Sequence, residues 1–133
     1  MVDQNFPNEE MLSRYRMPAE WYPHQRCWML WPYRTDNWKS NAAPAQAAFL
    51  QVAKAISNFE PVSIGVCKDQ MEKAQRFLED FKSMTTLKHP IDLVEIESND
   101  SWIRDTGPTF LVPKEPKVQK KLLGVDWIFN AWG

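Results

Sequence analysis

Glycine, cysteine and histidine are scarce in this sequence of 133 residues, which holds four glycines, two cysteines and two histidines. So few glycines leave no glycine-rich loop for a phosphate group. Two cysteines do not make a disulfide framework, and we therefore expect an intracellular, reducing compartment. His24 and His89 stand apart beside prolines. We see no acid or cysteine near either one at ligand spacing, and we expect no metal site.

An excess of charge of one sign is also missing, because the formal net charge is -1. A chain without a basic field is not expected to bind nucleic acid. No run approaches the roughly 18 apolar residues of a membrane span, and the first 21 residues have no apolar stretch of signal-peptide length. The length suits one domain, in which 44% hydrophobic residues are enough for a core.

The hydrophobic pattern predicts an α/β fold in which strands and helices alternate before two final strands. Residues 1–24 are polar and proline-containing, and we expect an irregular arm there. Asp69 is a candidate N-cap for the second helix. The expected elements are strands at 27–32, 62–67, 91–97, 109–112 and 122–130, and helices at 42–59 and after Asp69. The charged segment 112–121 is expected to be a solvated hairpin connection rather than a binding patch.

Acids, an aromatic residue and an arginine crowd into "ESNDSWIRDTGPTF", residues 97–110, directly after a predicted strand. Ligands of such sheets tend to bind where loops leave the carboxyl ends of the strands. The carboxylate of Asp105 offers two oxygens, which suit the fork of a planar guanidinium. Alternatively, Asp105 pairs with Arg104 or caps the turn at Thr106-Gly107. Spacing alone favours this structural alternative.

The neighbours of Asp105 also have two interpretations each. Trp102 stands over a bound cation, or it anchors the loop to the core, and the sequence favours neither. Asn99 and Asp100 support the site or hold an amine, although a simple Asx turn explains them better. Arg104 is expected to brace Asp105 or Glu97 through a salt bridge, because it would repel a cationic ligand.

Neither cysteine has the setting of a nucleophile in the sequence. Lys68 follows Cys67 and is a cation of the kind that lowers a thiol pKa, whereas Cys27 lies in an apolar run. Cysteines in such strands are usually inert core residues. We therefore expect no nucleophile within these 133 residues.

Three segments resemble the agmatine deiminases, a group that also contains the bacterial-type peptidylarginine deiminases. They are "MPAEWYPHQRCWMLWPYRTDNW", "NDSWIRDTGPTF" and "FNAWG", in the family's order. The resemblance implies a pentein fold, a ring of five α/β modules, and hydrolysis of agmatine to N-carbamoylputrescine and ammonia on the route to putrescine. It also implies no metal or organic cofactor. In that chemistry a cysteine thiolate attacks the guanidinium carbon, a histidine is acid and base, and carboxylates hold the cation.

Carried over to this chain, the resemblance makes Asp105 a guanidinium-binding aspartate and Trp102 a substrate-contacting residue, with Asn99, Asp100 and Arg104 as possible support. The family's histidine and cysteine come from later modules, so neither role passes to a residue here. Residues 25–133 are then expected to form the first one or two modules of the ring. We expect such a fragment to be inactive alone, and the full-length protein to be a homodimer.

Two other functions stay open at this stage. The chain is alternatively a non-catalytic module that binds a cationic amine or guanidinium, or that pairs with a full-length subunit. The third possibility is deimination of arginine within proteins, since the same group contains both activities.

Overall fold

The computed structural model describes residues 9–115 and 122–128. The chain divides into two compact units. The larger unit is His24–Ile103, and the smaller one combines Met1–Pro23 with Arg104–Gly133. Each unit is described below by itself.

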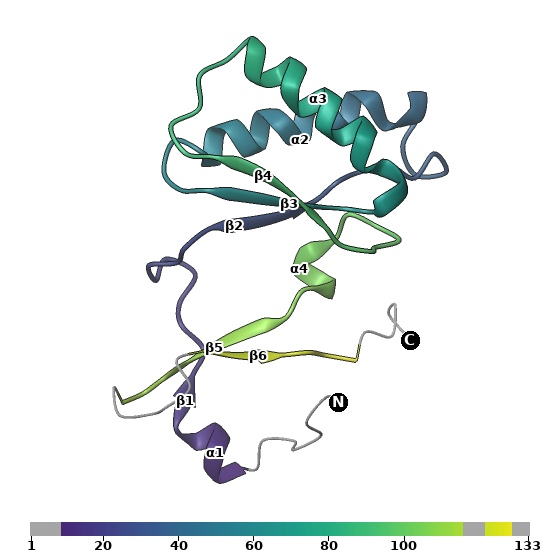
Figure 1. Cartoon of the computed structure of the whole chain (residues 1–133). Helices are drawn as coiled ribbons and strands as arrows, with labels where there is room; N and C mark the ends of the chain where they lie inside the picture. Colours follow the sequence, from purple (N-terminus) through teal and green to yellow (C-terminus); the bar gives the residue numbers. More distant parts are fainter. Residues whose placement is uncertain (1–8, 116–121, 129–133) are drawn as a thin grey trace. The chain divides into compact units, whose positions relative to one another are not determined.

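A three-stranded parallel sheet forms the larger unit (Figure 1). Its strands are β2 (Cys27–Leu30), β3 (Val62–Val66) and β4 (Ile91–Glu95), in the spatial order β2-β3-β4. Cys27 is paired with Val62 and Val62 with Ile91, so the three strands begin level with one another. The expected strands at 27–32, 62–67 and 91–97 are therefore confirmed, with slightly shorter bounds.

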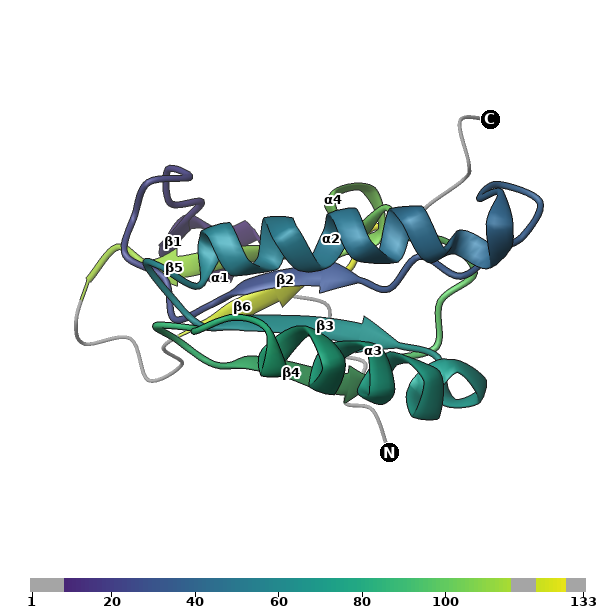
Figure 2. The same ribbon diagram turned by 90° about the horizontal axis from the view of Figure 1, so that it is seen from above.

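Two helices cover the same face of this sheet, as the view from above shows (Figure 2). They are α2 (Ala43–Ile56) and α3 (Met71–Ser83), and each turns an apolar stripe toward the strands. Each fully buried aliphatic side chain contributes about 1.5–3 kcal/mol to this packing. The core consists of Trp31, Leu50, Ala53, Val62, Ile64, Val66, Ala74, Leu78 and Ile91.

The starts of both helices differ from the expectation. A short 3-10 helix, η1 (Ser40–Ala42), precedes α2, and all three of its residues have positive φ angles. Another, η2 (Lys68–Gln70), precedes α3 and contains Asp69. Asp69 is therefore not the N-cap, because the chain already turns at Lys68 and the cap position falls on Gln70, which makes no side-chain capping bond.

The smaller unit is built on antiparallel pairing. Strand β5 (Thr109–Pro113) pairs with β1 (Tyr15–Arg16) on one side and with β6 (Leu123–Val125) on the other. The segment expected to be an irregular arm thus contains a strand, together with the short helix α1 (Glu9–Ser13). This strand was not predicted, because it forms by pairing with a segment that is distant in sequence and has no local periodicity of its own. Most of the expected connection at 112–121 lies outside the described residues.

Helix α4 (Ile103–Thr106) spans the boundary between the units, since the larger unit ends at Ile103. Within the described ranges, every helix is too short or too polar to cross a membrane.

Gly65 in the middle of β3 is a position where no side chain fits. A Cβ atom there would lie 2.7 Å from Leu30 Cδ2 and 3.1 Å from Ile96 Cδ1. We predict that Gly65→Ala lowers the free energy of unfolding by about 1–3 kcal/mol through overpacking, measured by urea denaturation. The matched control is Gly124→Ala, whose Cβ would come no closer than 3.8 Å to Phe110. An unchanged stability of Gly65→Ala would contradict the packing described here.

Candidate functional site

Three loops leave the carboxyl edge of the parallel sheet and meet there. They follow β2, β3 and β4, because parallel strands all end at the same edge. Backbone hydrogen bonds extend the pairing past the strand ends, from Trp31 N to Gly65 O at 2.8 Å and from Ile96 N to Val66 O at 3.0 Å. The loop after β4 is the segment that the sequence singled out.

Side chains of the loops after β2 and β3 form hydrogen bonds with the backbone of Ser98 in the loop after β4. The thiol of Cys67 donates to Ser98 O at 2.9 Å, and Ser98 N donates back to Cys67 Sγ at 3.3 Å. The hydroxyl of Tyr33 donates to the same Ser98 carbonyl at 2.7 Å. Cys67 is 5% exposed, which agrees with the expectation of an inert structural cysteine. Both polar groups of the Ser98 backbone are thereby satisfied by side chains from neighbouring loops.

The environment of Tyr33 keeps its hydroxyl protonated. The neighbouring Cys67 thiol, with a smaller contribution from burial, raises the pKa of Tyr33 to about 12. The hydroxyl therefore remains a donor for Ser98 throughout the neutral range.

Arg34 holds the next part of the loop. Its Nη1 donates to Asn99 O at 3.1 Å and lies 3.9 Å from Asp100 Oδ2. Its Nε donates to Asp36 at 3.0 Å, and this bonding holds the pKa of the Asp36 carboxyl below its usual range. Asn37 donates to Asp100 Oδ2 at 3.3 Å. The carboxylate of Asp100 is thus engaged by two side chains of the loop after β2.

The rest of the loop is held by local bonds. Asp100 Oδ1 accepts from Ser101 N at 2.8 Å, which is one residue on rather than the two residues on of an Asx turn. Glu97 accepts from the backbone N–H of Lys68 at 3.2 Å. The indole of Trp102, which follows these anchored residues, is 55% exposed.

In the smaller unit, Arg104 binds a residue that the sequence did not suggest. Its Nη1 lies 2.8 Å from Glu20 Oε1, and among the described residues it forms no salt bridge with Asp105 or Glu97. The expected brace of Arg104 is therefore wrong, because Glu20 lies far away in sequence but within the same unit. Asp105 lies on α4, is exposed, and has no hydrogen bond or ion pair within the described part of the chain.

The opposite, amino-terminal edge of the sheet holds a second cluster, formed by His24, Cys27 and Glu60. This contradicts the expectation that His24 has no acid or cysteine near it. The three-residue spacing of His24 and Cys27 was visible in the sequence. The proximity of Glu60 was not, because it results from the pairing of β2 with β3. Burial, then the hydrogen bond and the charge of Glu60, raise the pKa of the Cys27 thiol to about 11.

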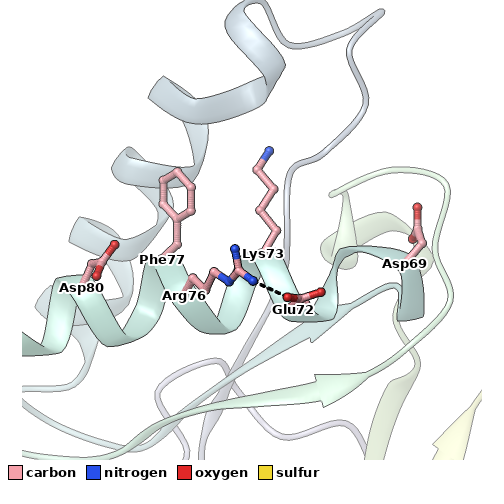
Figure 3. A pocket seen from close by; sticks show the side chains of 6 residues that line it. All are labelled: Asp69, Glu72, Lys73, Arg76, Phe77 and Asp80. Atoms are coloured by element: carbon pink, nitrogen blue, oxygen red, sulfur yellow. Dashed lines mark hydrogen bonds and ion pairs between the residues drawn. The ribbon is translucent and has the colours of Figure 1, made fainter.

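A hollow along α3 is a weaker candidate (Figure 3). Its side chains are mostly charged, and the pair formed by Glu72 and Arg76 neutralises itself across one helical turn. It contains no residue of the loop at 97–105. Its lining consists of Asp69, Glu72, Lys73, Arg76, Phe77 and Asp80.

Sequence reasoning found the loop but missed the residues that hold it. Tyr33 and Arg34 follow the expected strand at 27–32 and were given no role, and Cys67 was expected to be an inert core residue. Their position just past the ends of β2 and β3 is the signal that points to them, because parallel strands bring such residues to one edge.

Comparison with known proteins identifies the family. Residues 16–133 match the family model described as Porphyromonas-type peptidyl-arginine deiminase. The chain is 50% identical over 119 residues to an agmatine deiminase of Pseudomonas aeruginosa, which covers 90% of the chain and 29% of that protein. It is 45% identical over 130 residues to an agmatine deiminase of Medicago truncatula, which covers 95% of the chain and 32% of the relative.

Solved structures show the same relationship. An agmatine deiminase of Enterococcus faecalis superimposes with a TM-score of 0.73 at 39% identity, over 91% of this chain and 30% of that one. The chain therefore spans about three tenths of the length of these relatives and has part of their pentein fold. With a family match that takes in nearly all of its residues, the chain belongs to the Porphyromonas-type peptidyl-arginine deiminase family.

Proposed function

We propose that this chain supplies the guanidinium-binding loop of an agmatine deiminase, which hydrolyses agmatine to N-carbamoylputrescine and ammonia. Asp105 binds the guanidinium through both carboxylate oxygens, and Trp102 contacts the substrate. The agmatine deiminases of Pseudomonas aeruginosa and Medicago truncatula, at 50% and 45% identity, support this activity for the whole protein.

The observation that carries the proposal is the difference between the acids of the loop. Glu97 accepts a hydrogen bond from Lys68, and Asp100 is engaged by Asn37 and by the neighbouring backbone. Asp105 alone among these acids is left without a bonding partner in the described ranges. A carboxylate with both oxygens available suits the paired N–H donors of a guanidinium.

Trp102 adds a second attraction for the same ligand. A cation over an indole face gains roughly 0.5–2 kcal/mol, and the larger value applies when water is excluded. The 55% exposure of Trp102 leaves indole surface available to a ligand. The anchored residues just before it limit the freedom of the loop, which lowers the entropy lost on binding.

The attacking groups are proposed to come from outside these 133 residues. Cys67 is buried and bonded to Ser98, and Cys27 lies at the opposite edge of the sheet. Neither thiol is therefore placed beside the loop as an exposed nucleophile. This is why we expect the chain alone to be inactive toward agmatine.

The wider role follows from the proposed reaction. N-carbamoylputrescine leads to putrescine, so the protein would act in polyamine biosynthesis. We propose a cytoplasmic location and a homodimeric full-length enzyme without a cofactor in catalysis. The two free cysteines fit a reducing compartment.

Substitution of Asp105 in an active chimera tests the proposal. The chimera replaces the matched 119 residues of the Pseudomonas aeruginosa enzyme with those of this chain. We predict that it releases ammonia from agmatine, and that Asp105→Asn lowers kcat/KM roughly 10²–10³-fold, because the substrate cation loses its charged partner. The matched control is Asp80→Asn on α3, which removes the same charge and should leave the rate unchanged.

Three further comparisons complete this experiment. The 133-residue chain alone should release no ammonia. An arginine-containing peptide offered in place of agmatine tests the alternative of protein deimination.

Equal losses of activity in Asp105→Asn and Asp80→Asn, with both proteins shown to be folded by circular dichroism, would refute the role of Asp105. Agmatine binding by the chain alone, lost in Asp105→Asn, would instead favour a non-catalytic binding module.

Tyr33→Phe tests how the loop is held. Removing the hydroxyl deletes one of two side-chain donors to Ser98 O, so we predict a loss of about 0.5–1.5 kcal/mol in the free energy of unfolding below pH 10. The stability of the unsubstituted chain should fall as the pH rises toward 12, because the raised pKa of Tyr33 disfavours the phenolate in the folded state. Tyr33→Phe should lack this component of the decline.

The control for this substitution is Tyr22→Phe, which removes a hydroxyl that donates no hydrogen bond among the described residues. Its effect should stay within about 0.5 kcal/mol. If both substitutions have the same effect on stability and on its pH dependence, then Tyr33 does not hold Ser98.

A further inference from the structure

His24, Cys27 and Glu60 converge at the amino-terminal edge of the parallel sheet. Cys27 is the first residue of β2, and Glu60 lies two residues before the start of β3. The backbone N–H of Cys27 donates to Pro61 O at 3.0 Å, which fixes the two chain segments side by side. His24 lies three residues before Cys27 on the same segment. All three residues belong to the larger unit.

The ligand atoms of these residues lie close enough together to share one ion. Nδ1 of His24, Sγ of Cys27 and a carboxylate oxygen of Glu60 are all within 4.8 Å of one another. Glu60 Oε1 is 3.3 Å from Sγ, and Oε2 is 2.6 Å from Nδ1. Ligand atoms on a tetrahedral zinc ion are about 3.3–3.7 Å apart, given the usual zinc–ligand bond lengths. Small side-chain rotations therefore suffice to surround an ion.

A second observation points to a missing partner of Glu60. Its Oε2 atom is buried and accepts no hydrogen bond in the described structure, although the imidazole of His24 is only 2.6 Å away. The contact thus brings two potential ligand atoms together without the alignment of a hydrogen bond. A buried carboxylate oxygen that lacks an aligned hydrogen-bond donor is poorly compensated, and a cation bound by Glu60 and His24 together would supply that compensation.

The donor set selects the kind of ion. One nitrogen, one sulfur and one oxygen suit a borderline-soft divalent cation, whereas magnesium and calcium prefer oxygen alone. Cys27 and Glu60 are partly shielded, while the more exposed His24 leaves a path for the ion and room for a water molecule as the fourth ligand. We propose that His24, Cys27 and Glu60 form a binding site for one divalent cation of the zinc class.

The position of this site assigns it a structural role. It ties the segment before β2 to the segment before β3, at the edge of the sheet opposite the loop at 97–102. An ion there cannot contact a ligand bound at the carboxyl edge. Its effect is to stabilise the larger unit by mass action, since a cation that binds only the folded chain shifts the folding equilibrium.

Zinc titration of the reduced 133-residue chain tests the site, and the composition supplies a matched control. The chain has two histidines and two cysteines, so one of each lies outside the proposed site. We expect one zinc ion per chain by isothermal calorimetry, and at least about tenfold weaker binding in Cys27→Ser and in Glu60→Gln. The control His89→Gln should keep the affinity of the unsubstituted chain.

Cobalt provides a second readout that identifies the sulfur ligand. A cobalt–thiolate bond gives a near-ultraviolet charge-transfer band, which should be present in the unsubstituted chain and in His89→Gln but absent in Cys27→Ser. If Cys27→Ser does not fold, as judged by circular dichroism, Glu60→Gln still tests the zinc affinity. The proposal is overturned by the lack of stoichiometric zinc binding, or by binding that survives in Glu60→Gln or is lost in His89→Gln. If zinc does not bind, the contact between His24 and Glu60 is an ion pair without a metal.

Discussion

The parallel pairing of β2, β3 and β4 is the constraint on which the rest of the larger unit depends. Because the strands run in one direction and begin level, their carboxyl ends bring three loops together and their amino ends bring three other segments together. The anchoring of residues 97–102 and the proposed cation site both follow from this arrangement. The carboxyl edge holds residues 97–102, including Trp102, and the amino edge holds the proposed cation site.

Side chains from two loops determine the conformation of the third. Tyr33 and Cys67 satisfy the backbone of Ser98, and Arg34 extends the same support to Asn99. Each bond contributes only about 0.5–1.5 kcal/mol. Together they order the loop before a ligand arrives, so less conformational entropy is lost on binding. Glu97 and Asp100 are used in this support or in neighbouring contacts, whereas the carboxylate of Asp105 has no partner among the described residues.

The sequence predicted those strands and helices whose apolar residues repeat at short range. The strands and helices of the larger unit were found because their apolar residues repeat with the periods of a strand and of a helix. Strand β1, the salt bridge of Arg104 with Glu20, and the approach of Glu60 to His24 were not predicted. Each of these joins segments that are distant in sequence, so no local spacing reveals it. For Asp105 spacing alone favoured a structural role, and guanidinium binding by this residue is a prediction that comes from the resemblance to agmatine deiminases.

The central claim is that Asp105 is the acid of this loop that holds a guanidinium. The most direct measurement is a crystal structure of the chimera with agmatine bound. The account predicts that guanidinium nitrogens lie about 2.7–2.9 Å from both carboxylate oxygens of Asp105, with the indole of Trp102 within about 6 Å of the cation. A guanidinium held by a different acid, with the carboxylate of Asp105 facing solvent, would contradict it.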